Sequence, residues 1–316
     1  MEKNKEDDIM KKKILTGILA GVLAIGTLTG CGNSGTGAAE NGPAQGETAA
    51  DAGSAQATEH TADAVAAGQP ESKGTITVAA SATPHAEILE QAKAILAEQG
   101  WDLQVTVFDD YIQPNEVVES GEFDANYFQH IPYLEEFNET KGTHLVNVGG
   151  IHYEPFGIYP GTKKDLSELA EGDVIAVPND TTKEARALLL LEANGIITLK
   201  EDAGLTATVN DIVENPYGIK IEELEAAQVA RVVPEVAFVV LNGNYALQAG
   251  YTVANDSIAY ETGDSEAAKT YVNVIAVKEG NEQNEGIQAL VEVLRSDAVK
   301  QYINDTYNGA VIPSGE

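Results

Sequence analysis

Apolar residues after Gly74 recur with the two periods of regular secondary structure. Thr83 and Pro84 are typical of a helix start, and the apolar residues that follow share one face up to Gly100, where the helix ends. Short apolar or alternating runs indicate strands at 75–78, 103–108, 173–177, 236–241 and 272–277, and helices are indicated at 181–194 and from 285 onward. Strands and helices therefore alternate, which favours an α/β fold with parallel sheets covered by helices on both faces.

The sequence from Gly74 to Glu316 is long for a single hydrophobic core. A chain of this size commonly divides into two units, each with a core of its own. We therefore expect two lobes in this part of the chain, which contains no internal repeat of short period.

The first thirty residues have the three zones of a secretory signal. Five lysines between positions 3 and 13 precede an uncharged stretch from 14 to 30, and small residues lead to Cys31. A membrane-spanning helix is the weaker alternative, because about 20 residues are typical of such a span. The residues Leu28-Thr29-Gly30-Cys31 resemble the bacterial lipobox. This resemblance implies cleavage before Cys31 and diacylglyceryl modification of its thiol, the only thiol of the chain, outside the cytoplasm.

The segment 31–73 has the composition of an acidic tether. After Cys31 it consists mostly of Ala, Gly, Glu, Asp, Gln, Ser and Thr, and Val65 is its only bulky aliphatic residue. Such a segment cannot bury enough apolar area to offset the loss of chain entropy. We therefore predict a disordered tether that lets the folded part rotate near the membrane.

The charge of the chain excludes one large class of partner. Its formal net charge is −31, from 19 Lys and Arg against 50 Asp and Glu. A phosphate backbone must be met by a basic face, so we expect no nucleic-acid partner. The single cysteine also excludes an internal disulfide and a cysteine-based metal cluster.

Motifs for catalysis and for metal binding are absent from the sequence. It contains no G-x-S-x-G, H-E-x-x-H, Walker or EF-hand pattern and no G-x-G-x-x-G after a strand. Asp109 and Asp110 are adjacent and are expected in a solvated turn. We expect no metal, no cofactor and no catalytic residue, although an enzyme is not excluded. The histidines lack metal-ligand spacing and are expected to be surface or hydrogen-bonded core residues: His60, His85, His130, His144 and His152.

A polar and aromatic run from 124 to 133 is the first candidate for a binding site. It combines Tyr127, Phe128 and Tyr133 with His130 and two side-chain amides. The carboxyl ends of strands line ligand crevices in α/β lobes, and an apolar wall with a few polar groups is typical of small-molecule sites. An ordinary amphipathic edge is the alternative.

Arginine provides the second candidate. After the tether the chain contains only Arg186, Arg231 and Arg295. Arg186 lies in the first turns of a predicted helix, whose start attracts anions, and a guanidinium can hold a carboxylate with two hydrogen bonds. A plain surface arginine is the alternative. Arg295 is expected to face water, and Arg231 is ambiguous.

Several ordered sequence blocks resemble one family. Together they are similar to the NlpA/MetQ lipoproteins, the methionine-binding subunits of bacterial ABC importers. The resemblance extends from about Thr75 to Pro313, and the lipobox agrees with it, whereas the tether is not part of it. The blocks are Pro84-His85-Ala86-Glu87-Ile88-Leu89, Tyr111-Ile112-Gln113-Pro114-Asn115, 124–133, Pro178-Asn179-Asp180 with 186–190, 204–208, 211–216, 223–228 and 242–247.

The resemblance implies a two-lobed, periplasmic-binding-protein-like α/β fold of type II, with the ligand in the cleft between the lobes. Residues 74–153 and 277–316 are expected in the first lobe and 154–276 in the second, joined by crossing strands near 153–159 and 273–277. Closure about these strands would bury the ligand, and the importer would read the closed form.

The resemblance also implies roles for individual residues. Tyr111, Phe128 and Tyr133 would form the thioether pocket, with His130 adjacent. Arg186 would hold the α-carboxylate, and Asn242, Asn244 and Asn273 would supply amide groups to the amino-acid head. Two departures stand out. At 182–185 this chain has Thr-Lys-Glu-Ala, where the family often has Pro or Ser followed by Asn-Glu-Gly, and this difference can alter the contacts with the amino-acid head. Position 156 is Phe, where the family often has Met, and this difference is expected only to repack the hinge.

The expected function is therefore that of an extracytoplasmic, lipid-anchored solute-binding protein at the cell membrane. It would capture methionine, with the preference between the L and D forms left open, and deliver it to an ABC permease and ATPase. We expect a monomer that meets the membrane only through its N-terminal lipid. The alternatives are a binder of another small amino acid and an extracytoplasmic enzyme or adhesin built on the same fold.

Overall fold

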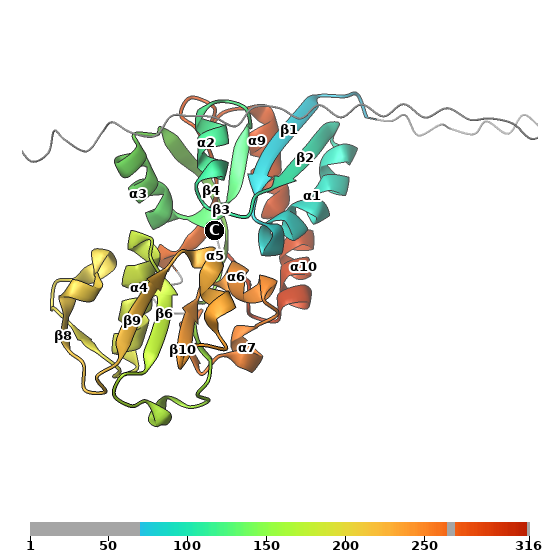
Figure 1. The fold of residues 1–316 in the computed structure, drawn as a ribbon. Helices are drawn as coiled ribbons and strands as arrows, with labels where there is room; N and C mark the ends of the chain where they lie inside the picture. Colours follow the sequence, from blue (N-terminus) through green and yellow to red (C-terminus); the bar gives the residue numbers. More distant parts are fainter. Residues whose placement is uncertain (1–69, 264–268, 315–316) are drawn as a thin grey trace, which may run out of the picture. The chain divides into compact units, whose positions relative to one another are not determined.

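The computed structural model describes residues 70–263 and 269–314, which form two main β-sheets with surrounding helices (Figure 1). The predicted signal sequence at 1–30, the lipobox cysteine Cys31 and the tether up to residue 69 lie outside the described residues. Within the described part, no helix has both the length and the apolar character that crossing a membrane requires.

The first sheet has six strands and belongs to the first lobe. β1 pairs in parallel with β2 and β3, whereas β12 lies antiparallel between β3 and β4. The strand order is β13 (Ile312–Pro313), β4 (Leu145–Tyr153), β12 (Val272–Lys278), β3 (Ala125–His130), β1 (Gly74–Ala80) and β2 (Trp101–Val107).

Helices cover both faces of this first sheet. Successive side chains of β12 point to opposite faces of the sheet. Val274 and Ala276 pack with α2 and α3 on one face. Ile275 and Val277 belong to the core formed with α1, α9 and α10 on the other. Figure 1 shows α1, α9 and α10 together beside β1 and β2. The helices are α1 (Glu87–Glu98), α2 (Gln113–Glu119), α3 (Ile131–Lys141), α9 (Glu285–Leu294) and α10 (Asp297–Tyr307).

The second sheet has five strands and forms the second lobe with its own helices. β10 pairs in parallel with β6 and antiparallel with β5. The strand order is β11 (Ala259–Tyr260), β5 (Gly157–Pro160), β10 (Phe238–Leu241), β6 (Val174–Pro178) and β9 (Lys220–Leu224), and a separate pair consists of β7 (Thr198–Leu199) and β8 (Ile212–Glu214). The helices are α4 (Thr181–Ala193), α5 (Ala226–Val229), α6 (Gly243–Gln248) and α7 (Val253–Asp256), with short turns η2 (Leu166–Glu168), η3 (Gly204–Thr206), η4 (Val209–Asp211) and η5 (Ala230–Val232). The turn η1 (Ala82–Ala86) belongs to the first lobe, where it joins β1 to α1.

The two-lobed α/β architecture agrees with the prediction, but three details differ. Both main sheets are mixed rather than parallel, because strands next to the crossings run against their neighbours. The chain crosses between the lobes for the second time before Val272, because β12 pairs with β4 from Val272 onward. The segment 273–277, which was predicted to make this crossing, is therefore a strand inside the first sheet. The predicted tail helix is two helices, because the Ser296 side chain accepts a hydrogen bond from the Val299 backbone N–H and starts α10.

Candidate functional site

A pocket lies between the lobes, where the end of β3 meets the first turns of α4 and α6. The space free of atoms in and before this pocket is about 330 Å³, with the solvent at its opening included. Seven of the eight ligand-binding residues predicted from the sequence line it: Tyr111, Phe128, His130, Arg186, Asn242, Asn244 and Asn273. The eighth, Tyr133, lies directly behind them against the rings of Tyr111 and Phe128.

Tyr111 and Phe128 form an aromatic wall of the pocket and belong to a buried cluster that also contains Tyr245 of the second lobe. Tyr111 lies 5.8 Å from Phe128 and 5.0 Å from Tyr245, measured between ring centroids. All six residues of β3 are buried, so the polar and aromatic run at 124–133 is the inner strand of a core and not an amphipathic edge. Pro132 stands in the first turn of α3, and the imidazole of His130 caps this helix. The turn therefore fixes His130 and Tyr133 beside the pocket.

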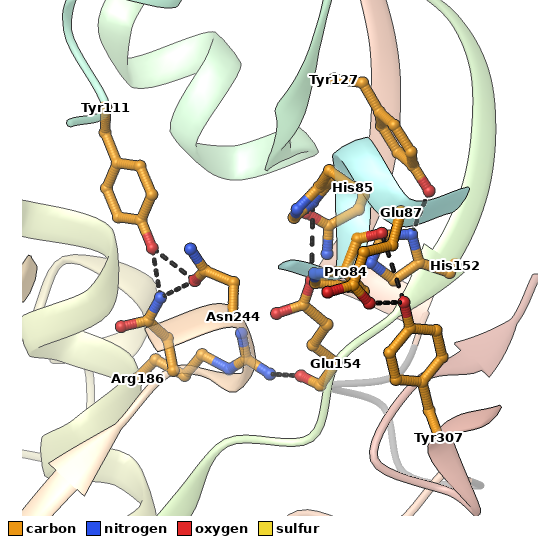
Figure 2. A network of polar contacts seen from close by, with 12 residues as sticks. Pro84, His85, Glu87, Tyr111, Tyr127, His152, Glu154, Arg186, Asn244 and Tyr307 are labelled. Atoms are coloured by element: carbon orange, nitrogen blue, oxygen red, sulfur yellow. Dashed lines mark hydrogen bonds and ion pairs between the residues drawn. The ribbon is translucent and has the colours of Figure 1, made fainter. Parts of the chain in front are cut away.

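Arg186 projects from the second turn of α4 and is buried. Its Nε lies 2.9 Å from Oε1 of Glu261, and one terminal amino group also pairs with Glu261. The same amino group donates to the Glu154 carbonyl oxygen at 2.9 Å (Figure 2). The guanidinium carbon lies 4.2 Å from the ring centroid of Tyr271 and 4.7 Å from that of Phe156. Burial opposes the charge, but the Glu261 carboxylate holds the pKa of Arg186 above its ordinary value.

Glu261 fixes this guanidinium by binding one of its edges. The carboxylate also accepts hydrogen bonds from the Tyr153 hydroxyl at 2.7 Å and the Phe156 backbone N–H at 3.1 Å. These bonds of Arg186 use Nε and one terminal nitrogen, so its other terminal amino group is the one left to meet a ligand. Such a planar group suits a carboxylate.

The amides of Asn242 and Asn244 meet the Tyr111 hydroxyl across the cleft. Tyr111 donates to Oδ1 of Asn244 at 2.6 Å, and Nδ2 of Asn242 donates to both of these oxygens (Figure 2). Among the described residues, Oδ1 of Asn242 and Nδ2 of Asn244 have no hydrogen-bond partner although both atoms are buried. The pocket thus holds one acceptor and one donor that a polar ligand can satisfy.

His130 adds a further buried donor. Its Nδ1 accepts the backbone N–H of Tyr133 at 3.2 Å, so Nε2 carries the proton, and this atom has no partner within the described residues. Burial and then the charges of Lys183 and Arg186 lower the pKa of His130 well below its usual range. The ring is therefore neutral and donates through Nε2.

A second polar cluster fills the junction of the first crossing, residues 154–156, with β4. His152 Nε2 donates to Oε1 of Glu154 at 2.8 Å, its Nδ1 meets the Tyr127 hydroxyl, and His85 Nε2 lies 3.1 Å from Oδ1 of Asn273 (Figure 2). Burial lowers the pKa of His85 to about 4 and that of His152 to about 3. Burial also raises the pKa of Glu154. The Glu154 side chain packs closely against Gly243, since a Cβ at that glycine would lie 2.6 Å from Cβ of Glu154.

His85 and His152 are far apart in the sequence, but the fold brings them together with Glu154 in this cluster. Ligand atoms of His85, His152 and Glu154 lie within 4.8 Å of one another, close enough to hold a metal ion. The facing atoms already bond to one another or to Asn273, as in a hydrogen-bonded core. Among the described residues, Nδ1 of His85 is buried without a partner. His85 and His152 thus have the hydrogen-bonded core role, one of the two predicted for the histidines. Their closeness in the fold corrects the expectation that no histidines are spaced for a metal.

Sequence reasoning missed Glu154, Lys183 and Glu261. Glu154 and Lys183 line the pocket, and Glu261 holds Arg186. The signal for Lys183 is its position three residues before Arg186, which places both on one side of the helix start. No local pattern identifies Glu261, because it lies 75 residues from the arginine that it binds.

The other residues discussed from the sequence lie away from the pocket. Arg231 is exposed in η5. Arg295 was expected to face water, but it is half-buried, and its Nε donates to the Gly150 carbonyl oxygen at 2.9 Å. Its long side chain reaches back from the end of α9 to β4, which corrects the expectation. Asp109 and Asp110 lie in the predicted turn, where Oδ1 of Asp110 accepts the Ile112 backbone N–H at 2.7 Å.

The arrangement can bind a zwitterion with an apolar side chain. Donors of Arg186, Asn244 and His130 suit a carboxylate, acceptors of Asn242 and Glu154 suit an ammonium group, and the rings suit an alkyl or thioether chain. The described lining contains no Ser, Thr or Cys, so it provides no hydroxyl or thiol nucleophile apart from the phenol of Tyr111.

Comparison with known proteins gives consistent matches along the folded part. The sequence matches the family model described as NlpA lipoprotein over residues 76–315. The methionine-binding lipoprotein MetQ of Bacillus subtilis is 41% identical over 253 residues, which are 79% of this chain and 91% of that protein. A structure from Ruminococcus gnavus described as that of a lipoprotein is 77% identical, with a TM-score of 0.75, covering 76% of this chain and 99% of that one. A nutrient-binding protein from Burkholderia cenocepacia, solved with methionine bound, is 39% identical, with a TM-score of 0.72, covering 76% of this chain and 99% of that one.

Proposed function

Because the chain belongs to the NlpA lipoprotein family, we propose that it is a solute-binding protein that captures methionine for an ABC importer. The observation that carries the proposal is the pocket between the lobes, in which Arg186 and unpartnered amide atoms lie beside a wall of aromatic rings. A solute-binding protein needs no catalytic group, since ligand binding itself shifts the population toward the closed form.

Each part of an amino acid has a partner of suitable chemistry in this pocket. The free amino group of Arg186, with Asn244 and His130, would hold the α-carboxylate. Glu154 and Oδ1 of Asn242 would accept the α-ammonium group, and Asn273 would keep its role near the head group while bonded to His85. The thioether would lie against Tyr111, Phe128 and Tyr133, where sulfur–aromatic contacts contribute about 0.3–1.5 kcal/mol each.

The location of the protein follows from its N-terminal sequence. We propose that Cys31 carries a diacylglyceryl group and anchors the chain to the outer face of the cell membrane. A tether over 31–73 would let the folded lobes reach the permease while the lipid stays in the bilayer. The partners of the bound form would be the permease and ATPase of the importer.

Calorimetric titration with the twenty amino acids tests the proposal, after bound ligand has been stripped by partial unfolding. Methionine should bind, and Arg186→Ala should weaken its binding by about 10²–10⁴-fold, because the carboxylate loses a desolvated partner. Arg231→Ala is the matched control, since Arg231 is exposed, and it should leave the affinity unchanged. Failure of methionine to bind, or equal effects of the two substitutions, would contradict the proposal. A different amino acid binding in its place would favour the alternative ligand class.

A further inference from the structure

Lys183 places a buried positive charge at the aromatic end of the pocket. Its side chain is 6% exposed, and its ammonium nitrogen lies 4.0 Å from the ring centroid of Tyr133 and 4.4 Å from that of Tyr111. Oδ1 of Asp180, the residue that caps α4, lies 3.2 Å from the same nitrogen. The ammonium group therefore touches two of the rings on which an apolar ligand chain would otherwise rest.

The hydrogen bonds of this ammonium group are incomplete. An ammonium has three N–H donors, and among the described residues the carboxylate of Asp180 is the one hydrogen-bond acceptor that it meets. The remaining directions meet aromatic faces, which attract a cation but accept no full hydrogen bond. Removing a charge from water is costly unless donors are satisfied, and burial lowers the pKa of Lys183. A lysine kept in such a place, on the lining of a pocket, indicates a role toward a ligand.

We propose that Lys183 makes the side-chain end of this pocket a polar subsite for a neutral acceptor oxygen on a linear amino acid. A sulfoxide and a carboxamide share this chemistry. The inference rests on the proposed function, because Arg186 must hold the amino-acid head for the ligand chain to point toward Lys183.

The surrounding charges favour a neutral acceptor over a carboxylate. Asp180 already balances the charge of Lys183, and a second anion next to it would be repelled. The faces of Tyr111, Tyr133 and Phe128 remain available to the methylene groups and to the sulfur of the ligand. The pocket would thus take a chain that is apolar along its length and carries an oxygen near its end.

Titration calorimetry of the full chain in detergent tests the inference with methionine, methionine sulfoxide, glutamine, glutamate and norleucine. In the wild type, methionine sulfoxide or glutamine should bind at least as tightly as methionine, and glutamate should bind more weakly than glutamine. Lys183→Met keeps the length of the chain but removes the donor. It should reduce the affinity for the acceptor ligand relative to that for methionine by about 10- to 100-fold, the contribution of a hydrogen bond to a charged group.

A matched control and the wild-type ranking keep the test decisive. Lys93→Met changes a lysine that is 44% exposed on α1 and should leave all affinities unchanged. A relative change below tenfold in Lys183→Met overturns the inference, as does a wild type that binds methionine more tightly than both neutral acceptor ligands. If Lys183→Met does not fold, the wild-type ranking alone decides. If no amino acid binds the wild type, it is the proposed function that fails.

Discussion

Two buried histidines should make the folded chain sensitive to mild acid. His85 and His152 lie in the cluster at the first crossing, where burial lowers their pKa values to about 4 and about 3. An unfolded chain exposes both rings to water, where their pKa is about 6.5. As the pH falls below that value, the unfolded state takes up protons that the folded state cannot bind.

The size of this effect follows from the two pKa shifts. Each histidine stabilises the fold fully above pH 6.5, and this contribution is lost as the pH falls, levelling off near the folded pKa. Between pH 7 and pH 5 the loss is about 2 kcal/mol for each ring, given folded values of about 4 and about 3. Glu154 opposes the loss, because its raised pKa lets the folded state bind a proton before the unfolded state does. The wild type should therefore lose less than the about 4 kcal/mol of the two histidines alone.

Urea unfolding at several pH values between 7 and 5 measures this loss, with Trp101, the only tryptophan, as the fluorescent probe. His152→Gln cannot take up a proton in either state, so its free energy of unfolding should fall by about 2 kcal/mol less than that of the wild type over this range. His144→Gln is the control, because this side chain is 66% exposed. If the wild type and His152→Gln give parallel curves against pH, the cluster does not bury a neutral His152 and the reasoning is refuted.

Three further predictions address the pocket, its supporting ion pair and the anchor. Phe128→Ala should weaken methionine binding by about 1–3 kcal/mol in calorimetry, because it opens a void in the aromatic wall, and an unchanged affinity would remove the wall from the site. Glu261→Gln should lower the thermal midpoint and the free energy of unfolding by about 3 kcal/mol, since Arg186 stays buried without its charged partner; an unchanged midpoint would show that the pair is dispensable. Cys31→Ala should yield a protein without lipid by mass spectrometry, and normal acylation of this variant would contradict the anchor assignment.

The elements with a strong local pattern could be predicted from the sequence. α4 begins where Asp180 and Thr181 predict it, and β1 and β12 lie on predicted strand runs. Strand direction could not be predicted, because the same apolar pattern serves a parallel and an antiparallel strand. β12 is such a case: its residues indicate a buried strand, but its place between β3 and β4 depends on where the chain crosses between the lobes.

Site residues could be predicted from the sequence where the residue type is rare in the folded part or forms a visible local block. Arg186 could be chosen because it is the one arginine of the folded part near a helix start, and the aromatic run is visible as a block. Glu154 and Glu261 could not be chosen from among 50 acidic residues, since their significance lies in what they contact. His85 and His152 meet only because the sheet brings distant segments together.

Glu261 joins three parts of the molecule through a single carboxylate. It lies in the second connection between the lobes, binds Tyr153 and Phe156 at the first connection, and holds the guanidinium of Arg186. The two connections are thus fastened to each other at the same carboxylate that orients Arg186, the cationic group proposed to meet the ligand's carboxylate. A change in the angle between the lobes that disturbs these bonds of Glu261 should therefore also lower the affinity for the ligand. Because such coupling is reciprocal, a bound ligand should oppose that change in angle by the same free energy. A transporter that pulls the lobes apart would therefore release the ligand by the same movement.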